Sequence, residues 1–133
     1  MLRLFIDASV IFSMAYSDKE ASREIFNLAR LQKATLVTCT YALQEVTARV
    51  RRDCPGTLAA LQEIVPSHIF VIEEANETEI IAALPVVAGA RRSASDALVS
   101  FDRKHLHTRR VADYIHALVI ASAEALRTVR EHQ

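Results

Sequence analysis

Apolar residues along the chain alternate between short unbroken runs and runs with helical spacing. Residues 1–9 form a strand-like apolar run that ends on a carboxylate, Asp7, and two small residues. A run without polar alternation is typical of a central strand in a parallel sheet, which is covered on both faces. Further short apolar runs predict strands over 35–39, 69–72, 97–100 and within 114–120.

Helical spacing predicts helices between these strands. Residues 17–20, Ser-Asp-Lys-Glu, have the spacing of a capping box and precede a stripe that includes Ile25 and Leu28. Residues 10–16 form a short apolar turn or helix, and Thr40 is expected to cap the helix that follows the second strand. The remaining predicted helices cover 41–52, 56–65, Pro85 to about 93, and 122–131. This alternation predicts the α/β class, as a three-layer α/β/α sandwich with a central parallel sheet.

Length and composition limit the organisation to one domain over residues 1–133. Hydrophobic residues make up 51% of the chain, and glycine and proline together occupy only five positions, 2 and 3 respectively, which excludes a disordered chain. The chain begins directly on a strand, and no apolar run approaches the ~18 residues of a membrane span. We therefore expect a cytoplasmic protein without a membrane segment, in which Cys39 and Cys54 are free thiols.

Formal net charge is +0, but the charge is unevenly distributed. Residues 1–90 carry 8 basic and 11 acidic side chains, whereas residues 91–133 carry 8 and 5. The basic pairs Arg91–Arg92 and Arg103–Lys104 lie in this second part. Each pair alone is typical of solvated surface, and together they could form a rim that contacts phosphates.

Three carboxylates are predicted to meet at one edge of the sheet. Asp7 ends the first strand, Asp102 follows the fourth, and Glu45 lies in the second turn of the helix after the second strand. Helical side chains lean toward the N-terminus, so Glu45 points back to that same edge. The alternatives are that Asp7 caps the next helix and that Glu45 complements the helix dipole.

Other candidate sites are weaker. Asp96 begins the fourth strand, about 20 Å from Asp102 if the segment is extended, and is expected to be a turn residue at the opposite edge. His105 and His107 share no metal-ligand spacing and are expected at the surface. With only two glycines, the chain holds no dinucleotide or P-loop motif.

The order strand-Asp, helix-Glu, strand-Ser-x-Asp resembles a PIN domain, the fold of many metal-dependent ribonucleases. The resemblance is carried by FIDASVIFSMAYSDKEASREIFNLA, LVTCTYALQEVTARV and PVVAGARRSASDALVSFDRKHL. It implies that Asp7, Glu45 and Asp102 bind Mg²⁺ or Mn²⁺ and that the ion activates a water for attack on RNA. It also implies that the hydroxyls of Ser9 and Ser100 orient ligands or waters. Hard cations prefer such oxygen ligands.

One departure from the family pattern affects the expected metal content. The family usually places a fourth acid where this chain has Ala83, and Glu79 lies one helical turn earlier. Three acids favour one ion rather than two. The resemblance implies a metal-dependent endoribonuclease, with a role as the toxin of a toxin–antitoxin pair, an antitoxin partner and a homodimer as further expectations. The alternative is a catalytically degenerate PIN-fold protein that serves as an RNA-binding or protein-interaction module.

Overall fold

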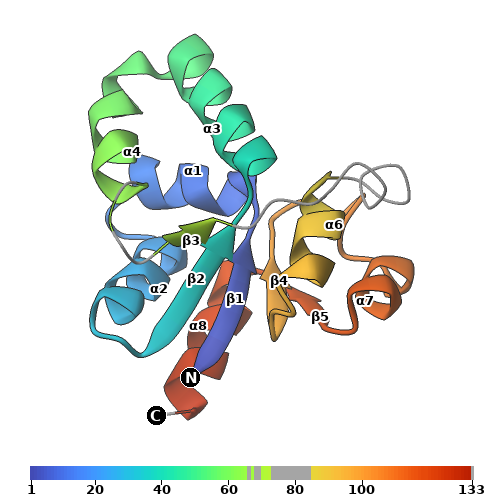
Figure 1. The fold of residues 1–133 in the computed structure, drawn as a ribbon. Coiled ribbons are helices and arrows are strands. Elements are labelled where there is room, and N and C mark those ends of the chain that lie inside the picture. Colours follow the sequence, from blue (N-terminus) through green and yellow to red (C-terminus); the bar gives the residue numbers. More distant parts are fainter. Residues whose placement is uncertain (66, 68–69, 73–84, 133) are drawn as a thin grey trace.

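The computed structural model describes residues 1–65, 67, 70–72 and 85–132, and these form an α/β fold around a five-stranded parallel sheet (Figure 1). The strand order is β3-β2-β1-β4-β5, and every neighbouring pair is parallel. The strands are β1 (Leu2–Ile6), β2 (Ala34–Thr38), β3 (Phe70–Ile72), β4 (Ala97–Val99) and β5 (Leu118–Ile120). The predicted central parallel sheet is therefore confirmed.

Helices cover both faces of this sheet, which confirms the predicted three-layer sandwich. Helices α6 and α7 pack together on one side, whereas α1, α2 and α8 lie on the other, where α2 contacts both α1 and α8 (Figure 1). The helices are α1 (Ala8–Tyr16), α2 (Ala21–Arg30), α3 (Thr40–Asp53), α4 (Leu58–Ile64), α6 (Pro85–Arg92), α7 (Arg109–Ile115) and α8 (Ser122–Glu131), with a short 3₁₀ turn, η1 (Pro55–Thr57), before α4. No helix in the described part of the chain is long and apolar enough to cross a membrane.

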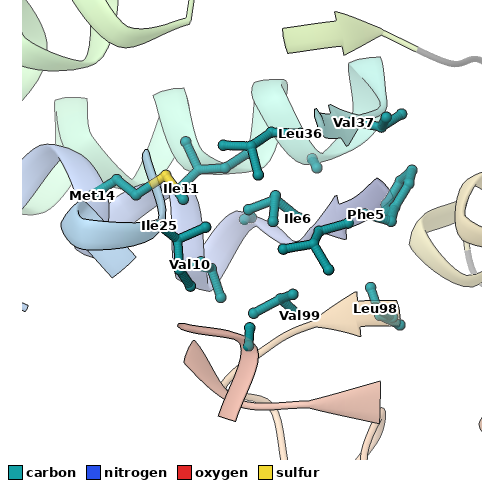
Figure 2. Close-up of a cluster of buried hydrophobic side chains, with 14 of the residues drawn as sticks. Phe5, Ile6, Val10, Ile11, Met14, Ile25, Leu36, Val37, Leu98 and Val99 are labelled. Carbon is teal, nitrogen blue, oxygen red and sulfur yellow. The ribbon is translucent and has the colours of Figure 1, made fainter. Parts of the chain in front are cut away.

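Strand β1 lies in the middle of the core. Its last three residues, Leu4, Phe5 and Ile6, are fully buried, because successive side chains point to opposite faces and both faces are covered. Figure 2 shows Phe5 and Ile6 among buried side chains from the neighbouring strands and helices. On the α6 side, a Cβ atom added to Gly89 would lie 2.9 Å from the Phe5 ring. Glycine therefore allows α6 to approach the sheet closely.

The structure corrects two predicted helix starts and adds one helix that the sequence analysis missed. Ser17 ends α1 through its N–H bond to the Ser13 carbonyl, and its hydroxyl accepts from Lys19 N, so residues 17–20 are not a capping box and α2 begins at Ala21. Cys39, not Thr40, occupies the N-cap position of α3. Helix α7 has no counterpart in the sequence prediction.

The chain changes direction within the sheet at β1. From β1 it adds β2 and β3 on one side, and then β4 and β5 on the other. Ligands of open parallel sheets bind outside the carboxyl ends of the strands at such a switch point. Here the N–H of Asp7 donates to the Val99 carbonyl at 3.0 Å, which joins the carboxyl ends of β1 and β4. This edge carries the acidic residues.

Candidate functional site

The structure brings the three predicted acids to one hollow at this edge. Asp7, Glu45 and Asp102 line a cavity of about 140 Å³. Asp7 follows β1, Glu45 comes from the second turn of α3, and Asp102 follows β4. The other lining residues are Tyr41, Pro85, Val86 and Leu106, so no lysine, arginine or histidine lines the described wall. The hollow concentrates negative charge.

Asp7 is held by hydroxyl groups rather than used as a helix cap. It occupies the N-cap position of α1, but its side chain makes no capping bond. Its Oδ2 instead accepts from the Ser100 hydroxyl at 2.7 Å and the Ser9 hydroxyl at 3.1 Å. The residue is 6% exposed, and no hydrogen bond to Oδ1 is seen within the described residues. The capping alternative is therefore wrong, and among the described residues one carboxylate oxygen has no donor.

Both serines also bind the segment that carries Asp102. The Ser9 hydroxyl accepts from the Phe101 N–H at 3.1 Å, and the Ser100 hydroxyl accepts from the Asp102 N–H at 3.0 Å. Ser100 is fully buried, so its two bonds hold Asp7 and Asp102 in a fixed relation. The family resemblance implies that these hydroxyls orient ligands or waters. In the structure they orient the carboxylate of one acid and the backbone of another.

Two histidines, expected at the surface, contact this segment. His105 is exposed, yet its backbone N–H donates to Asp102 Oδ1 at 3.0 Å and its Nδ1 lies 3.2 Å from both carboxylate oxygens. His107 is half-buried and donates from Nε2 to the Ser100 carbonyl at 2.6 Å. A tight turn after Asp102, closed by bonds from the Leu106 and His107 N–H groups to the Asp102 carbonyl, brings His107 back against β4. The contact that the sequence analysis missed is that of His105 with Asp102, and its local signal is the Asp-x-x-His spacing of residues 102–105.

The pKa of the Glu45 carboxyl is affected by the other two acids. The side chain is exposed, yet the neighbouring wall of the hollow partly desolvates its carboxyl and raises its pKa above the usual value, and the negative charges of Asp7 and then Asp102 raise that pKa further. Like charges that share a site disfavour each other's ionised form, and a bound cation relieves this repulsion. The alternative that Glu45 only complements the helix dipole does not account for this coupling.

The residues present fit a hydrated divalent ion. Within the described residues, no three acidic, histidine or cysteine side chains are grouped so that they could hold an ion directly. Mg²⁺, however, usually keeps several waters and binds through one or two carboxylates. The cavity is well above the volume that one water needs, and no donor to Oδ1 of Asp7 lies in the part of the chain that the structure describes. Ala83 and Glu79 lie outside the described residues.

Asp96 lies at the other end of the sheet, as predicted. Its Oδ2 accepts from the Arg3 N–H at 2.7 Å, and its own N–H donates to the Arg3 carbonyl at 2.7 Å. Arg3 belongs to the start of β1, so Asp96 joins the amino ends of β1 and β4. It is not a ligand for the hollow.

The four candidate RNA-binding cations are divided between the two ends of the molecule. Arg91 and Arg92 end α6, whereas Pro85, which lines the hollow, begins it. An eight-residue helix is about 12 Å long, so this pair does not join the acids. Arg103 and Lys104 are exposed and follow Asp102 directly. Only this second pair adjoins the hollow, and its role in RNA binding stays a prediction.

Comparisons with known proteins support the fold and leave the family open. No protein-family model and no curated protein matches the chain. Among solved structures, it is similar to the crystal structure of PAE2754 from Pyrobaculum aerophilum, with 13% sequence identity and a TM-score of 0.64. The match covers 98% of this chain and 90% of that chain. At this identity the likeness shows the fold alone.

Proposed function

We propose that this protein is a metal-dependent ribonuclease of the PIN type that hydrolyses phosphodiester bonds in RNA. The observation that carries the proposal is the meeting of Asp7, Glu45 and Asp102 in one hollow at the switch point of the sheet. The raised pKa of Glu45 agrees with it, because after partial desolvation the negative charges of Asp7 and Asp102 raise this pKa further, and a cation would relieve their repulsion.

The three acids have distinct parts in this proposal. A bound Mg²⁺ or Mn²⁺ would supply a water of lowered pKa and stabilise the charge that develops on the phosphate. Asp7, fixed by two hydroxyls, would bind the ion through Oδ1. Glu45 and Asp102 would hold the ion or its waters from α3 and from the turn after β4. The proposed site of these three acids holds one ion.

The family resemblance alone supports four parts of the proposal: RNA as the substrate, an antitoxin partner, a role as a toxin, and a homodimer. A cleavage assay should therefore begin with a mixed pool of single-stranded RNA rather than one target. Such a pool tests RNA as a class of substrate without assuming a particular target sequence.

A second function is favoured by two observations. Within the described residues, no group of three side chains is placed to hold an ion directly, and position 83 carries no acid. A PIN-fold protein that binds RNA or another protein without cleaving it agrees with both facts. Its binding should survive removal of the acids and weaken with salt.

Cleavage with Mg²⁺ or Mn²⁺, compared between the natural protein and Asp7→Asn, tests the proposed function. The amide oxygen of asparagine can still accept from Ser9 and Ser100, so the fold should persist while the metal ligand is lost. The matched control is Asp113→Asn, which removes an exposed acid from α7. We expect metal-dependent cleavage that Asp7→Asn abolishes and Asp113→Asn retains. Equal activity in Asp7→Asn would refute the assignment.

A further inference from the structure

A second hollow adjoins the acidic one and is lined by aromatic rings. It has a volume of about 380 Å³ and is bordered by Phe12, Tyr16, Arg49 and Phe101. This volume is within the range of small-ligand pockets. Among the described residues, the exposed aromatic side chains are Tyr16, Tyr41 and Phe101, and each lines one of the two hollows. Among the described residues, the most exposed tyrosine and phenylalanine rings thus gather around the two hollows.

The rings and the cation of the second hollow form a stack. The rings of Phe12 and Tyr16 lie 5.5 Å apart between centroids with 14° between their planes. The guanidinium of Arg49 lies 3.8 Å from the centroid of Phe12. Tyr16 is 64% exposed, so the stack ends in an open aromatic surface. Aromatic faces and arginine planes are the groups on which proteins stack unpaired bases.

Each acid of the first hollow has a close neighbour in the second. The Ser9 hydroxyl donates to Asp7 and accepts from the Phe101 N–H. Phe101 directly precedes Asp102, and Arg49 lies one helical turn after Glu45 on α3. The two hollows therefore share a wall. A nucleotide whose phosphate reaches the acids would have its base within reach of the aromatic rings.

We propose that the hollow between α1, α3 and Phe101 is a base-binding subsite for single-stranded RNA. It stacks one unpaired base on Tyr16, the exposed end of the stack, whose Phe12 ring is covered by the guanidinium of Arg49. The proposal rests on the proposed function for its substrate, because the adjoining phosphate site is the one assigned above. Ser13 and Glu20 also line this hollow, as polar groups beside the rings.

The test separates base binding from cleavage by working without metal. The probe is a fluorescently labelled single-stranded 2′-O-methyl oligonucleotide in EDTA, and its comparison strand has the same length and charge but no bases. Anisotropy gives the Kd of each strand for the natural protein and for Tyr16→Ala and Arg49→Gln. The controls are Leu31→Ala, which removes an exposed apolar side chain elsewhere, and Arg127→Gln, which removes the same charge from α8.

We expect the natural protein to bind the strand with bases about tenfold more tightly than the strand without them. Tyr16→Ala and Arg49→Gln should remove most of this preference, and the two controls should keep it. Absence of the preference in the natural protein, or its persistence in both variants, would overturn the subsite and leave a protein partner as the occupant of the hollow.

Cleavage of ordinary RNA with Mg²⁺, measured separately, distinguishes failure of the two proposals. Base-dependent binding without any cleavage would support the subsite and refute the nuclease. Cleavage whose KM is unchanged by Tyr16→Ala and Arg49→Gln would overturn the subsite while the nuclease proposal stands.

Discussion

Ser100→Ala should destabilise the protein far more than the loss of one hydroxyl at the surface. The Ser100 hydroxyl is fully buried, donates to Asp7 at 2.7 Å and accepts from the Asp102 N–H at 3.0 Å. Alanine removes both bonds. It leaves a buried carboxylate oxygen with Ser9 as its remaining hydroxyl donor, and it leaves the Asp102 N–H without an acceptor.

The magnitude follows from the two bonds. A hydrogen bond to a charged group contributes about 1.5–3 kcal/mol to stability and a neutral one about 0.5–1.5 kcal/mol, so the free energy of unfolding should fall by about 2–4 kcal/mol. An unfolding entropy of about 2.1 cal/mol/K per residue converts this into a Tm lower by about 7–14 °C for a chain of 133 residues.

Urea and thermal unfolding, followed by far-ultraviolet circular dichroism, give both quantities. The matched control is Ser122→Ala on α8, which breaks a buried bond of 2.7 Å between the hydroxyls of Ser122 and Ser22. This neutral bond should cost only about 1 kcal/mol. In an Asp7→Asn background the cost of Ser100→Ala should shrink, because the acceptor is neutral. Equal losses for Ser100→Ala and Ser122→Ala would refute the reasoning.

Two further variants and one thiol reagent test other parts of the structure. Glu45→Gln should raise the stability of the metal-free protein at neutral pH by less than about 1 kcal/mol. The raised pKa of Glu45 means that its negative charge opposes folding at pH values above the unfolded pKa, and solvent screening of this exposed group keeps the effect small. In urea unfolding, the gain should vanish as the pH falls and Glu45 becomes protonated. In the same assay, Gly89→Ala should lower stability by about 1–3 kcal/mol despite alanine's higher helix propensity, because the new Cβ would lie 2.9 Å from the buried Phe5 ring. A gain in stability would mean that α6 can move away from the sheet. Burial raises the pKa of the Cys39 thiol, so a disulfide reagent should label Cys54 first in the native protein and both cysteines in urea; equal native rates would contradict the burial.

Much of the fold could be predicted from the sequence because the sheet is buried on both faces. The run at residues 1–9 has no polar alternation, and it forms the central strand β1. The three acids follow strands or lie near a helix start, so parallel topology alone brings them to one edge. Asp96 was placed at the opposite edge by the same geometry.

Other features depend on contacts between distant parts of the chain. Whether Asp7 caps α1 or binds elsewhere is decided by Ser100, which lies 93 positions away in the sequence. Local spacing suggested a capping box at residues 17–20, but Ser17 is used to end α1. Helix α7 was missed because its apolar stripe is short; its one local signal was Thr108, whose hydroxyl accepts from the Val111 N–H at 3.2 Å.

The central claim is that Asp7, Glu45 and Asp102 bind one divalent cation, and calorimetric titration of Mg²⁺ and Mn²⁺ tests it most directly. The natural protein and Asp113→Asn should show saturable binding of one ion per chain. Binding should be lost in Asp7→Asn and weakened in Glu45→Gln and Asp102→Asn. Absence of saturable binding in the natural protein, or unchanged affinity in Asp7→Asn, would contradict the account.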